Sequence, residues 1–345
     1  MPAKKIRVLV VDDSLFMREF IASEISKDQG IEVVGKASDP FEARDKIIEL
    51  APDVMTLDIQ MPKMNGIEFL KKLMPQYPLP VVVVSSVDGV VFDALDAGAV
   101  DFINKSSMKN EREKQSFISE LVVKIKIASI AKVGKHKHGP ARGAIAQKAV
   151  GDARGDSIIA IGASTGGTEA TAGVLKQLGN DLPGIVIVQH MPPVFTRLYA
   201  ERLNNECAME VKEASNGDIV RPGTALIAPG GMQMYVVKRG ATLRVECREG
   251  EKVSGHCPSV DVLFDSVSKL RGINSLGIIL TGMGSDGANG LLAMKKAGAS
   301  TIGQDKQSCV VYGMPAVAYN IGAVDVQLPL AGIPRQIYKW FNSLA

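Results

Sequence analysis

This 345-residue chain has few cysteines and no long apolar run. Its four cysteines lie in the second half without a C-x-x-C spacing, so we expect reduced thiols and no zinc site. No stretch approaches the roughly eighteen apolar residues of a membrane-spanning helix, and the first apolar run, Ile6–Val11, is too short for a signal peptide. We therefore expect a soluble, cytoplasmic protein without direct membrane insertion.

A strong net charge is missing as well. Lys and Arg number 40 against 37 Asp and Glu, which gives a formal net charge of +3. So small an excess does not favour a nucleic-acid partner. The 46% hydrophobic and 22% charged residues are typical of a globular protein, and the length favours two domains.

The first part of the chain alternates short β-branched runs with stretches of helical periodicity. The predicted strands are Ile6–Val11, Ile31–Ala37, Asp53–Leu57, Pro80–Val84 and Val100–Ile103. A last helix is expected near Glu111–Ala131, with an apolar stripe that includes Phe117 and Leu121. Five βα units predict a doubly wound parallel α/β domain over residues 1–131.

Periodicity disappears between residues 132 and 155, and the predicted element there is a basic, flexible linker. Its His136-Lys137-His138 is interpreted as solvated rather than as a metal clip. A second α/β domain is expected over residues 156–345, with strands at Ser157–Ile161, Gly184–Val188, Ala225–Ile227 and Leu276–Leu280. Segments Met232–Val237 and Thr242–Cys247 predict an antiparallel hairpin added to an otherwise parallel, doubly wound sheet.

Polar residues at strand ends form a first candidate site. Asp12 and Asp13 end the first strand and Asp58 ends the third, and these strands are neighbours if the order is 2-1-3-4-5. Converging carboxylates with room for phosphate oxygens suit Mg²⁺. Ser85 and Lys105 end the next two strands, so the site could accept a phosphoryl group on an aspartate. Singly, either of the first two acids could instead cap a helix, and the lysine could be a surface residue.

This set resembles the receiver domain of two-component response regulators across residues 5–131. The resemblance implies that Asp58 is the phosphoacceptor, that Ser85 is the switch hydroxyl and that Lys105 contacts the phosphoryl group. The implied metal ligands are Asp12, Asp13 and Asp58, with the carbonyl of Gln60. Receivers usually have proline after this lysine, and Ser106 stands there instead, which puts the usual cis peptide in doubt.

A second candidate site begins with Gly162-Ala163-Ser164-Thr165-Gly166, which matches G-x-S-x-G. The pattern presents a serine between a strand and a helix, where backbone N–H groups can hold an oxyanion. A Walker loop would need lysine where Thr168 stands, and a dinucleotide fingerprint fails because Ser164 occupies its second glycine position. A serine hydrolase is the favoured hypothesis.

The serine needs a base and an orienting acid. His190 follows the strand Gly184–Val188 and is favoured as the base over His256, which lies in a turn before a helix capped by Ser259. Asp286 follows the strand Leu276–Leu280 and fits the acid, although it could instead cap the next helix. The chain order Ser, His, Asp differs from that of α/β-hydrolases, which indicates a convergent triad on another α/β scaffold.

The strings G-A-S-T-G-G, Q-H-M-P and T-G-M-G-x-D-G, together with the receiver and linker, resemble the chemotaxis protein-glutamate methylesterases over nearly the whole chain. The resemblance implies a phosphorylation-regulated serine esterase that demethylates chemoreceptor glutamates and deamidates receptor glutamines. It implies Ser164, His190 and Asp286 as the triad, a chemotaxis histidine kinase as phosphodonor and no cofactor for ester hydrolysis. Candidate oxyanion donors are the backbone N–H groups near Met283 and Thr165.

Two rival functions are less favoured. A transcriptional regulator would carry a small helical output domain with a basic recognition helix, whereas this second half has several predicted strands. A nicotinamide-dependent reductase lacks its glycine fingerprint. Receptor docking could use Arg197 and Arg202, which are equally compatible with an ordinary solvated face.

Overall fold

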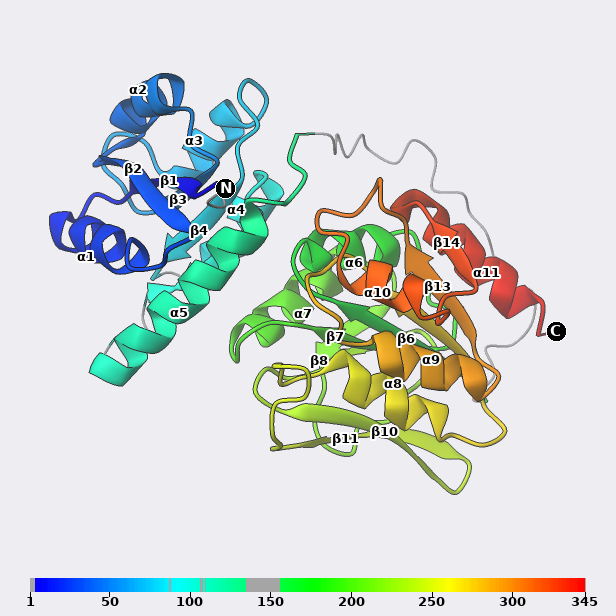
Figure 1. Cartoon of the computed structure of the whole chain (residues 1–345). Coiled ribbons are helices and arrows are strands. Elements are labelled where there is room, and N and C mark those ends of the chain that lie inside the picture. Colours follow the sequence, from blue (N-terminus) through cyan, green and yellow to red (C-terminus); the bar gives the residue numbers. More distant parts are fainter. Residues whose placement is uncertain (1–3, 87, 106–107, 109, 135–155, 345) are drawn as a thin grey trace. The chain divides into compact units, whose positions relative to one another are not determined.

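The structure, a computed structural model, describes residues 4–344 apart from 87, 106–107, 109 and 135–155. The chain divides into two compact units, Met1–Lys137 and His138–Ala345 (Figure 1). Most of the predicted linker, with its His136-Lys137-His138, therefore lies outside the described residues, as does Ser106. Each unit is considered by itself below.

The N-terminal unit contains a five-stranded, all-parallel sheet in the order β2-β1-β3-β4-β5, as predicted. Strands β3 and β4 are buried along their whole length, which explains their nearly unbroken apolar sequences. The strands are β1 (Ile6–Val11), β2 (Ile31–Ala37), β3 (Val54–Asp58), β4 (Val81–Ser85) and β5 (Asp101–Asn104).

Helices follow the strands of this sheet, and all of them except the fourth begin at a polar side-chain cap. The Ser14 hydroxyl accepts from Met17 N–H, and the Asp39 carboxylate accepts from two N–H groups of its helix. The helices are α1 (Leu15–Ile25), α2 (Pro40–Leu50), α3 (Gly66–Leu73), α4 (Val91–Asp96) and α5 (Glu111–Ala128), with a 3₁₀ turn at Asp88–Val90. The predicted stripe of the last helix is buried at Phe117 and Leu121, and the helix ends at Ala128 rather than near 131.

The C-terminal unit is built on a seven-stranded parallel sheet in the order β14-β13-β12-β6-β7-β9-β8. Four of its strands were predicted: β6 (Ser157–Ala163), β7 (Gly184–Gln189), β9 (Thr224–Ile227) and β12 (Asn274–Ile279). Three were not: β8 (Glu210–Glu213), β13 (Ser300–Gln304) and β14 (Val326–Leu328). The central strands β6, β7 and β12 are direct neighbours, so their carboxyl ends open onto one edge.

Helices lie on both sides of this sheet, with α6 and α7 on one side and α8 and α9 on the other (Figure 1). The helices are α6 (Gly167–Leu175), α7 (Phe195–Glu206), α8 (Val260–Ser268), α9 (Ala288–Lys296), α10 (Met314–Asn320) and α11 (Ile333–Asn342), preceded by a 3₁₀ turn at Leu330–Gly332. Within the part of the chain that the structure describes, no helix combines the length and apolarity needed to cross a membrane.

The predicted hairpin is present as β10 (Gln233–Arg239) and β11 (Thr242–Arg248). It does not extend the main sheet, as the sequence suggested, but forms a separate two-stranded sheet that packs on α8 (Figure 1). Alternate residues of both strands are buried in one cluster with Phe264 of that helix; they are Met234, Val236, Leu243 and Val245. The hairpin therefore covers α8 with one apolar face, because side chains alternate between the faces of a strand.

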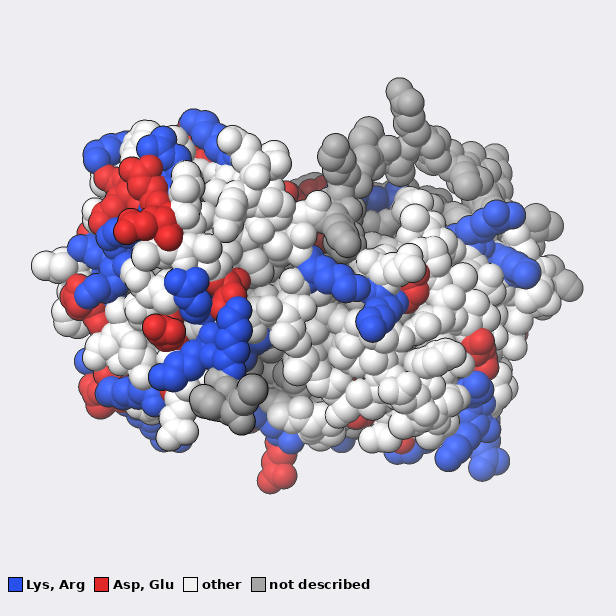
Figure 2. All heavy atoms as spheres, turned by 45° about the horizontal axis from the view of Figure 1, so that its top comes forward, with Lys and Arg blue, Asp and Glu red and all other residues white. Residues whose placement is uncertain are grey.

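Charged side chains of both signs are interspersed over the N-terminal unit on the face drawn in Figure 2. Exposed ion pairs such as Lys36–Glu19 (2.7 Å) and Lys72–Glu68 (2.9 Å) occur in this unit. Exposed pairs of this kind contribute only about 0–1 kcal/mol each. The stability of the unit therefore depends mainly on its buried strands and helix faces.

Candidate active site and candidate phosphorylation site

The three predicted metal-binding acids of the N-terminal unit lie together. One carboxylate oxygen from each of Asp12, Asp13 and Asp58 falls within 4.8 Å of the others. Asp12 and Asp58 are buried while Asp13 is exposed. The adjacency of β1 and β3 brings them together, because both strands end at the same edge of the sheet.

Lys105 supplies the positive charge next to these acids. Its Nζ lies 2.6 Å from Asp12 Oδ2 and 2.8 Å from Asp58 Oδ2, and its side chain is only 12% exposed. Burial nevertheless raises the pKa of Asp12, because it outweighs the lowering effect of Lys105, and the nearby Asp58 adds to the increase. A single lysine therefore does not balance the negative charge of the three carboxylates.

Two further predicted residues lie next to this cluster. Ser85 is buried at the end of β4, one position beyond Val84, which pairs with Asp58 across the sheet. The N–H of Gln60 donates to Asp58 Oδ1 at 3.3 Å, so the backbone of Gln60 lies next to the carboxylate of the candidate phosphoacceptor. The structure therefore brings Asp12, Asp13, Asp58 and Lys105 together and places Ser85 and Gln60 next to them in the fold, while their chemical roles stay predictions.

Ser164 begins the candidate site of the C-terminal unit, directly after β6. Its N–H donates to the Thr281 carbonyl at 3.0 Å, and its carbonyl accepts from the Gly167 N–H and the Gln189 side chain at 2.7 and 2.9 Å. A Cβ on Gly282 would come within 2.7 Å of the Ser164 Cβ, so only glycine allows this approach. The serine is thereby fixed between the ends of β7 and β12.

His190 and Asp286 form a direct pair at the same edge. His190 Nε2 lies 2.7 Å from Asp286 Oδ2, and their side chains are 7% and 1% exposed. The other ring nitrogen of His190, Nδ1, is buried and has no hydrogen-bond partner among the described residues. The His190 N–H donates to the Ala163 carbonyl at 3.1 Å, which joins this residue to the strand that carries Ser164.

Asp286 also anchors the start of helix α8. Its oxygens accept from Ser259 Oγ (2.7 Å), Val260 N–H (2.8 Å) and Asp261 N–H (3.0 Å). Burial raises the pKa of Asp286, but the hydrogen bond and charge of His190 and these other donors outweigh it, so the pKa is lowered. The alternative considered for this acid, capping the following helix, is wrong because Gly287 is the N-cap of α9.

His256, the less favoured candidate base, lies against His190. The two imidazole rings stack with centroids 3.6 Å apart and planes inclined by 10°. Sequence reasoning placed His256 in a turn before a helix capped by Ser259 and did not predict a contact with His190. No local pattern could have found the contact, because it joins segments 66 residues apart in the chain (256 − 190) that meet only in the folded sheet.

The loop that follows His190 is strained. Val194 has φ = 75° and ψ = −47°, and a β-branched residue rarely adopts a left-handed φ.

Helix α7, which follows Val194, carries the two arginines suggested for receptor docking. Its Arg202 is 15% exposed and lies 3.1 Å from Glu206 and 3.6 Å from Glu169. Arg197 on the same helix is 60% exposed, so it is the more accessible of the two arginines suggested for receptor docking.

The candidate oxyanion donors lie on two loops at this edge. Thr165 is buried directly after Ser164, and Met283 is 41% exposed directly after Gly282. The Gly282 carbonyl accepts from Gly313 N–H and Met314 N–H at 3.1 and 2.8 Å, which fixes the peptide that carries the Met283 N–H. Their role as oxyanion donors stays a prediction.

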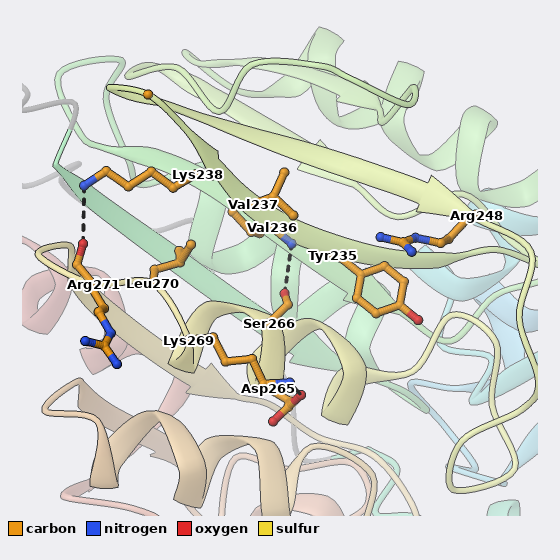
Figure 3. Close-up of a pocket in the computed structure, with 11 residues that line it drawn as sticks. Tyr235, Val236, Val237, Lys238, Arg248, Asp265, Ser266, Lys269, Leu270 and Arg271 are labelled. Atoms are coloured by element: carbon orange, nitrogen blue, oxygen red, sulfur yellow. Dashed lines mark hydrogen bonds and ion pairs between the residues drawn. The ribbon is translucent and has the colours of Figure 1, made fainter.

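A groove of about 570 Å³ lies elsewhere, between β10 and the C-terminal half of α8 (Figure 3). The Val236 N–H donates to Ser266 Oγ at 2.9 Å across its floor, and Lys238 Nζ donates to the Arg271 carbonyl at 3.3 Å. Ser164, His190 and Asp286 do not line this groove. The bonds across the groove instead attach the hairpin to α8 and to the segment that follows this helix.

The protein is of the response-regulator class, because its first unit matches a receiver domain and an α/β unit follows it. Residues 8–115 match the response regulator receiver domain, and residues 159–337 match CheB methylesterase. The chain belongs to the CheB methylesterase family.

Named relatives span the whole chain. It is 57% identical over 347 residues to protein-glutamate methylesterase/protein-glutamine glutaminase 2 of Syntrophomonas wolfei, which covers 100% of both chains. It is 54% identical over 342 residues to the protein-glutamate methylesterase/protein-glutamine glutaminase of Syntrophotalea carbinolica, with 97% of each covered. A crystal structure of the Thermotoga maritima CheB methylesterase catalytic domain is 34% identical and covers 55% of this chain and 99% of that one, with a TM-score of 0.52.

Proposed function

We propose that the C-terminal unit is a serine hydrolase that demethylates glutamate methyl esters of chemoreceptors and deamidates receptor glutamines in chemotaxis. The observation that carries the proposal is the His190–Asp286 pair at the strand edge where Ser164 is fixed. The names of the full-length relatives give the substrate class. Methylated chemoreceptors are therefore the proposed partners.

The proposed mechanism uses the unpaired ring nitrogen of His190. His190 Nδ1 accepts the Ser164 proton, and Oγ attacks the γ-carbonyl of the receptor glutamate ester. Asp286 stabilises the imidazolium through Nε2, and the N–H groups of Met283 and Thr165 are the proposed donors to the oxyanion. The imidazolium then protonates the leaving methanol, or ammonia from glutamine, and water releases the acyl-enzyme as glutamate.

A fluorophosphonate reagent tests the nucleophile without requiring receptor docking. We expect stoichiometric labelling of the full-length chain at Ser164, and no labelling of Ser164→Ala. The matched control is Ser285→Ala, which removes an exposed serine next to Asp286 and should label normally. Methanol release from methylated receptor should disappear in the first variant only, and more than about a hundredth of the activity remaining would refute the assignment, since triad losses are usually far larger.

For the receiver we propose phosphorylation of Asp58 by a chemotaxis histidine kinase, with Mg²⁺ held by Asp12, Asp13, Asp58 and the Gln60 carbonyl. The residues fit such an ion because three carboxylates converge and the pKa of Asp12 is raised in spite of Lys105. When bound, Mg²⁺ would neutralise charge between the carboxylates and the incoming phosphoryl group. Ser85 and Lys105 are the proposed contacts of the phosphoryl oxygens.

Phosphorylation is proposed to relieve an inhibition that the receiver (residues 1–131), joined by the linker (residues 132–155), exerts on the hydrolase (residues 156–345). Cutting after Lys148 should then raise basal esterase activity without a phosphodonor. Asp58→Asn in the intact chain should stay at basal activity and ignore acetyl phosphate. A folded 156–345 fragment no more active than the intact, unphosphorylated protein would exclude inhibition. A cytoplasmic location belongs to the same proposal, because a cytoplasmic kinase must reach Asp58.

A further inference from the structure

We infer that His256 is a positioning residue for His190, which holds the imidazole plane in the orientation needed to deprotonate Ser164. The inference rests on the proposed serine chemistry. Its basis is the parallel stack of the two rings, with centroids 3.6 Å apart and planes inclined by only 10°. Such a geometry covers the face of the His190 ring rather than touching one edge.

A face contact restricts a motion that the acid cannot restrict. Asp286 holds one ring atom of His190, Nε2, at 2.7 Å. The final torsion of a histidine side chain has a broad energy profile, so a ring held at one atom can still tilt. Tilting would move Nδ1, the atom proposed to receive the serine proton. A flat neighbour stacked on the ring opposes that tilt.

The backbone of His256 is fixed by a two-residue turn. Val253 N–H donates to the His256 carbonyl at 3.0 Å, and His256 N–H donates back to the Val253 carbonyl at 2.9 Å. The two residues between them, Ser254 and Gly255, both have positive φ, at 52° and 84°. That backbone is typical of the tight turns that join antiparallel segments. The turn therefore presents His256 from a closed backbone ring.

Gln233, the first residue of β10, ties this turn to the fold. Its side chain is buried and donates from Nε2 to the carbonyls of Glu251 (3.0 Å) and His256 (3.2 Å). Its Oε1 accepts from Ser259 N–H at 2.8 Å, next to the residues that hold Asp286. The hydrogen bond from Val236 to Ser266 attaches the same strand to α8 (Figure 3). The buried side-chain amide of Gln233 therefore fixes the position of His256 relative to the start of helix α8, which holds Asp286.

A positioning role differs from a second basic role in what the side chain must supply. Covering a ring face needs a flat ring, whereas proton transfer needs a ring nitrogen. His256→Phe keeps the first and removes the second. His256→Ala removes both, and His256→Gln offers a polar group without a ring.

The test uses the full-length chain, activated with acetyl phosphate and Mg²⁺. Two quantities are measured for each variant: the rate of fluorophosphonate labelling at Ser164, and kcat and KM for methylated receptor. For His256→Ala and His256→Gln we expect labelling and kcat to fall about 10- to 100-fold with KM within twofold of wild type, as for a misoriented catalytic group. For His256→Phe we expect recovery to within about threefold of wild type.

The matched control is Val253→Ala, a partly exposed side chain on the same turn, which should behave as wild type. Native folding of each variant is verified by the fluorescence of Trp340, the only tryptophan of the chain. Wild-type rates in both ring-free variants would overturn the inference, as would a His256→Phe enzyme as slow as His256→Ala. Failure of Ser164 to label in the wild type would instead overturn the proposed function, so the two failures are distinguishable.

Discussion

Replacing Asp286 by asparagine should remove catalysis and destabilise the C-terminal unit at the same time. The carboxylate accepts four hydrogen bonds, two at each oxygen. One backbone N–H faces each oxygen: Val260 N–H faces Oδ2, and Asp261 N–H faces Oδ1. Whichever way the asparagine amide is turned, its NH₂ group must face a backbone donor that is buried (Val260) or partly buried (Asp261).

The expected loss of stability follows from that count. A buried donor without an acceptor costs about 1–3 kcal/mol, and the remaining bonds lose the strength that a charged acceptor gives. We therefore expect Asp286→Asn to lower the free energy of unfolding by about 2–4 kcal/mol. Activity should fall by about 10⁴-fold, as when the acid of a serine protease triad is changed in this way. Ser164→Ala should match the loss of activity and leave stability within about 1 kcal/mol of wild type.

Urea titration followed by Trp340 fluorescence measures this difference in the correct unit. Trp340 is 7% exposed in helix α11, so its emission reports unfolding of the C-terminal unit and ignores the receiver. Fluorophosphonate labelling below the transition gives the activity of the same samples. Equal unfolding free energies for Asp286→Asn and Ser164→Ala would refute the reasoning, because they would mean that the anchor of α8 does not need a carboxylate.

Three other expectations follow from the geometry. His190→Gln should lower esterase activity at least about 10³-fold, and methanol release at near wild-type rate would show that another residue is the base. Asp13→Asn should raise the Mg²⁺ concentration needed for phosphorylation by acetyl phosphate without changing the urea stability of the receiver, followed by far-UV circular dichroism, because this acid is exposed; an unchanged Mg²⁺ requirement would remove it from the ligand set. Val194→Gly should raise stability of the C-terminal unit by up to about 2 kcal/mol by releasing backbone strain, whereas a clear decrease in the same titration would mean that its side chain matters more.

Sequence patterns predicted the central strands well because those strands are apolar and bounded by turns. Strands β1, β6 and β7 are runs of buried aliphatic residues, which need no tertiary information to be recognised. The edge strand β8 has the sequence Glu-Val-Lys-Glu, and β14 has three residues. Neither offers an apolar run, since an edge strand is partly exposed and often charged. The hairpin itself was predicted correctly, but its separation from the main sheet was not foreseen, because alternation predicts a strand and not its partner.

The candidate sites were predicted for a related reason. Parallel strands end at a common edge, so polar residues after successive strands could be grouped before the structure was known. That rule selected Ser164, His190 and Asp286, and the structure pairs His190 with Asp286 and joins the His190 backbone to Ala163, the residue before Ser164. It could not reach His256 or Gln233, because a stack and a buried amide network depend on a loop and a separate sheet.

The double use of Asp286 has a consequence for how such a domain decays when selection for hydrolysis is relaxed. A change at Ser164 silences the chemistry and leaves a folded domain that cells will retain. A change at Asp286 also removes stability, and proteins lie only slightly above the threshold at which they are degraded. Descendants that have lost the hydrolase activity should therefore lose Ser164 early and keep Asp286 long after the serine is gone. An acid preserved opposite a missing nucleophile would then record the demands of helix α8, not surviving activity.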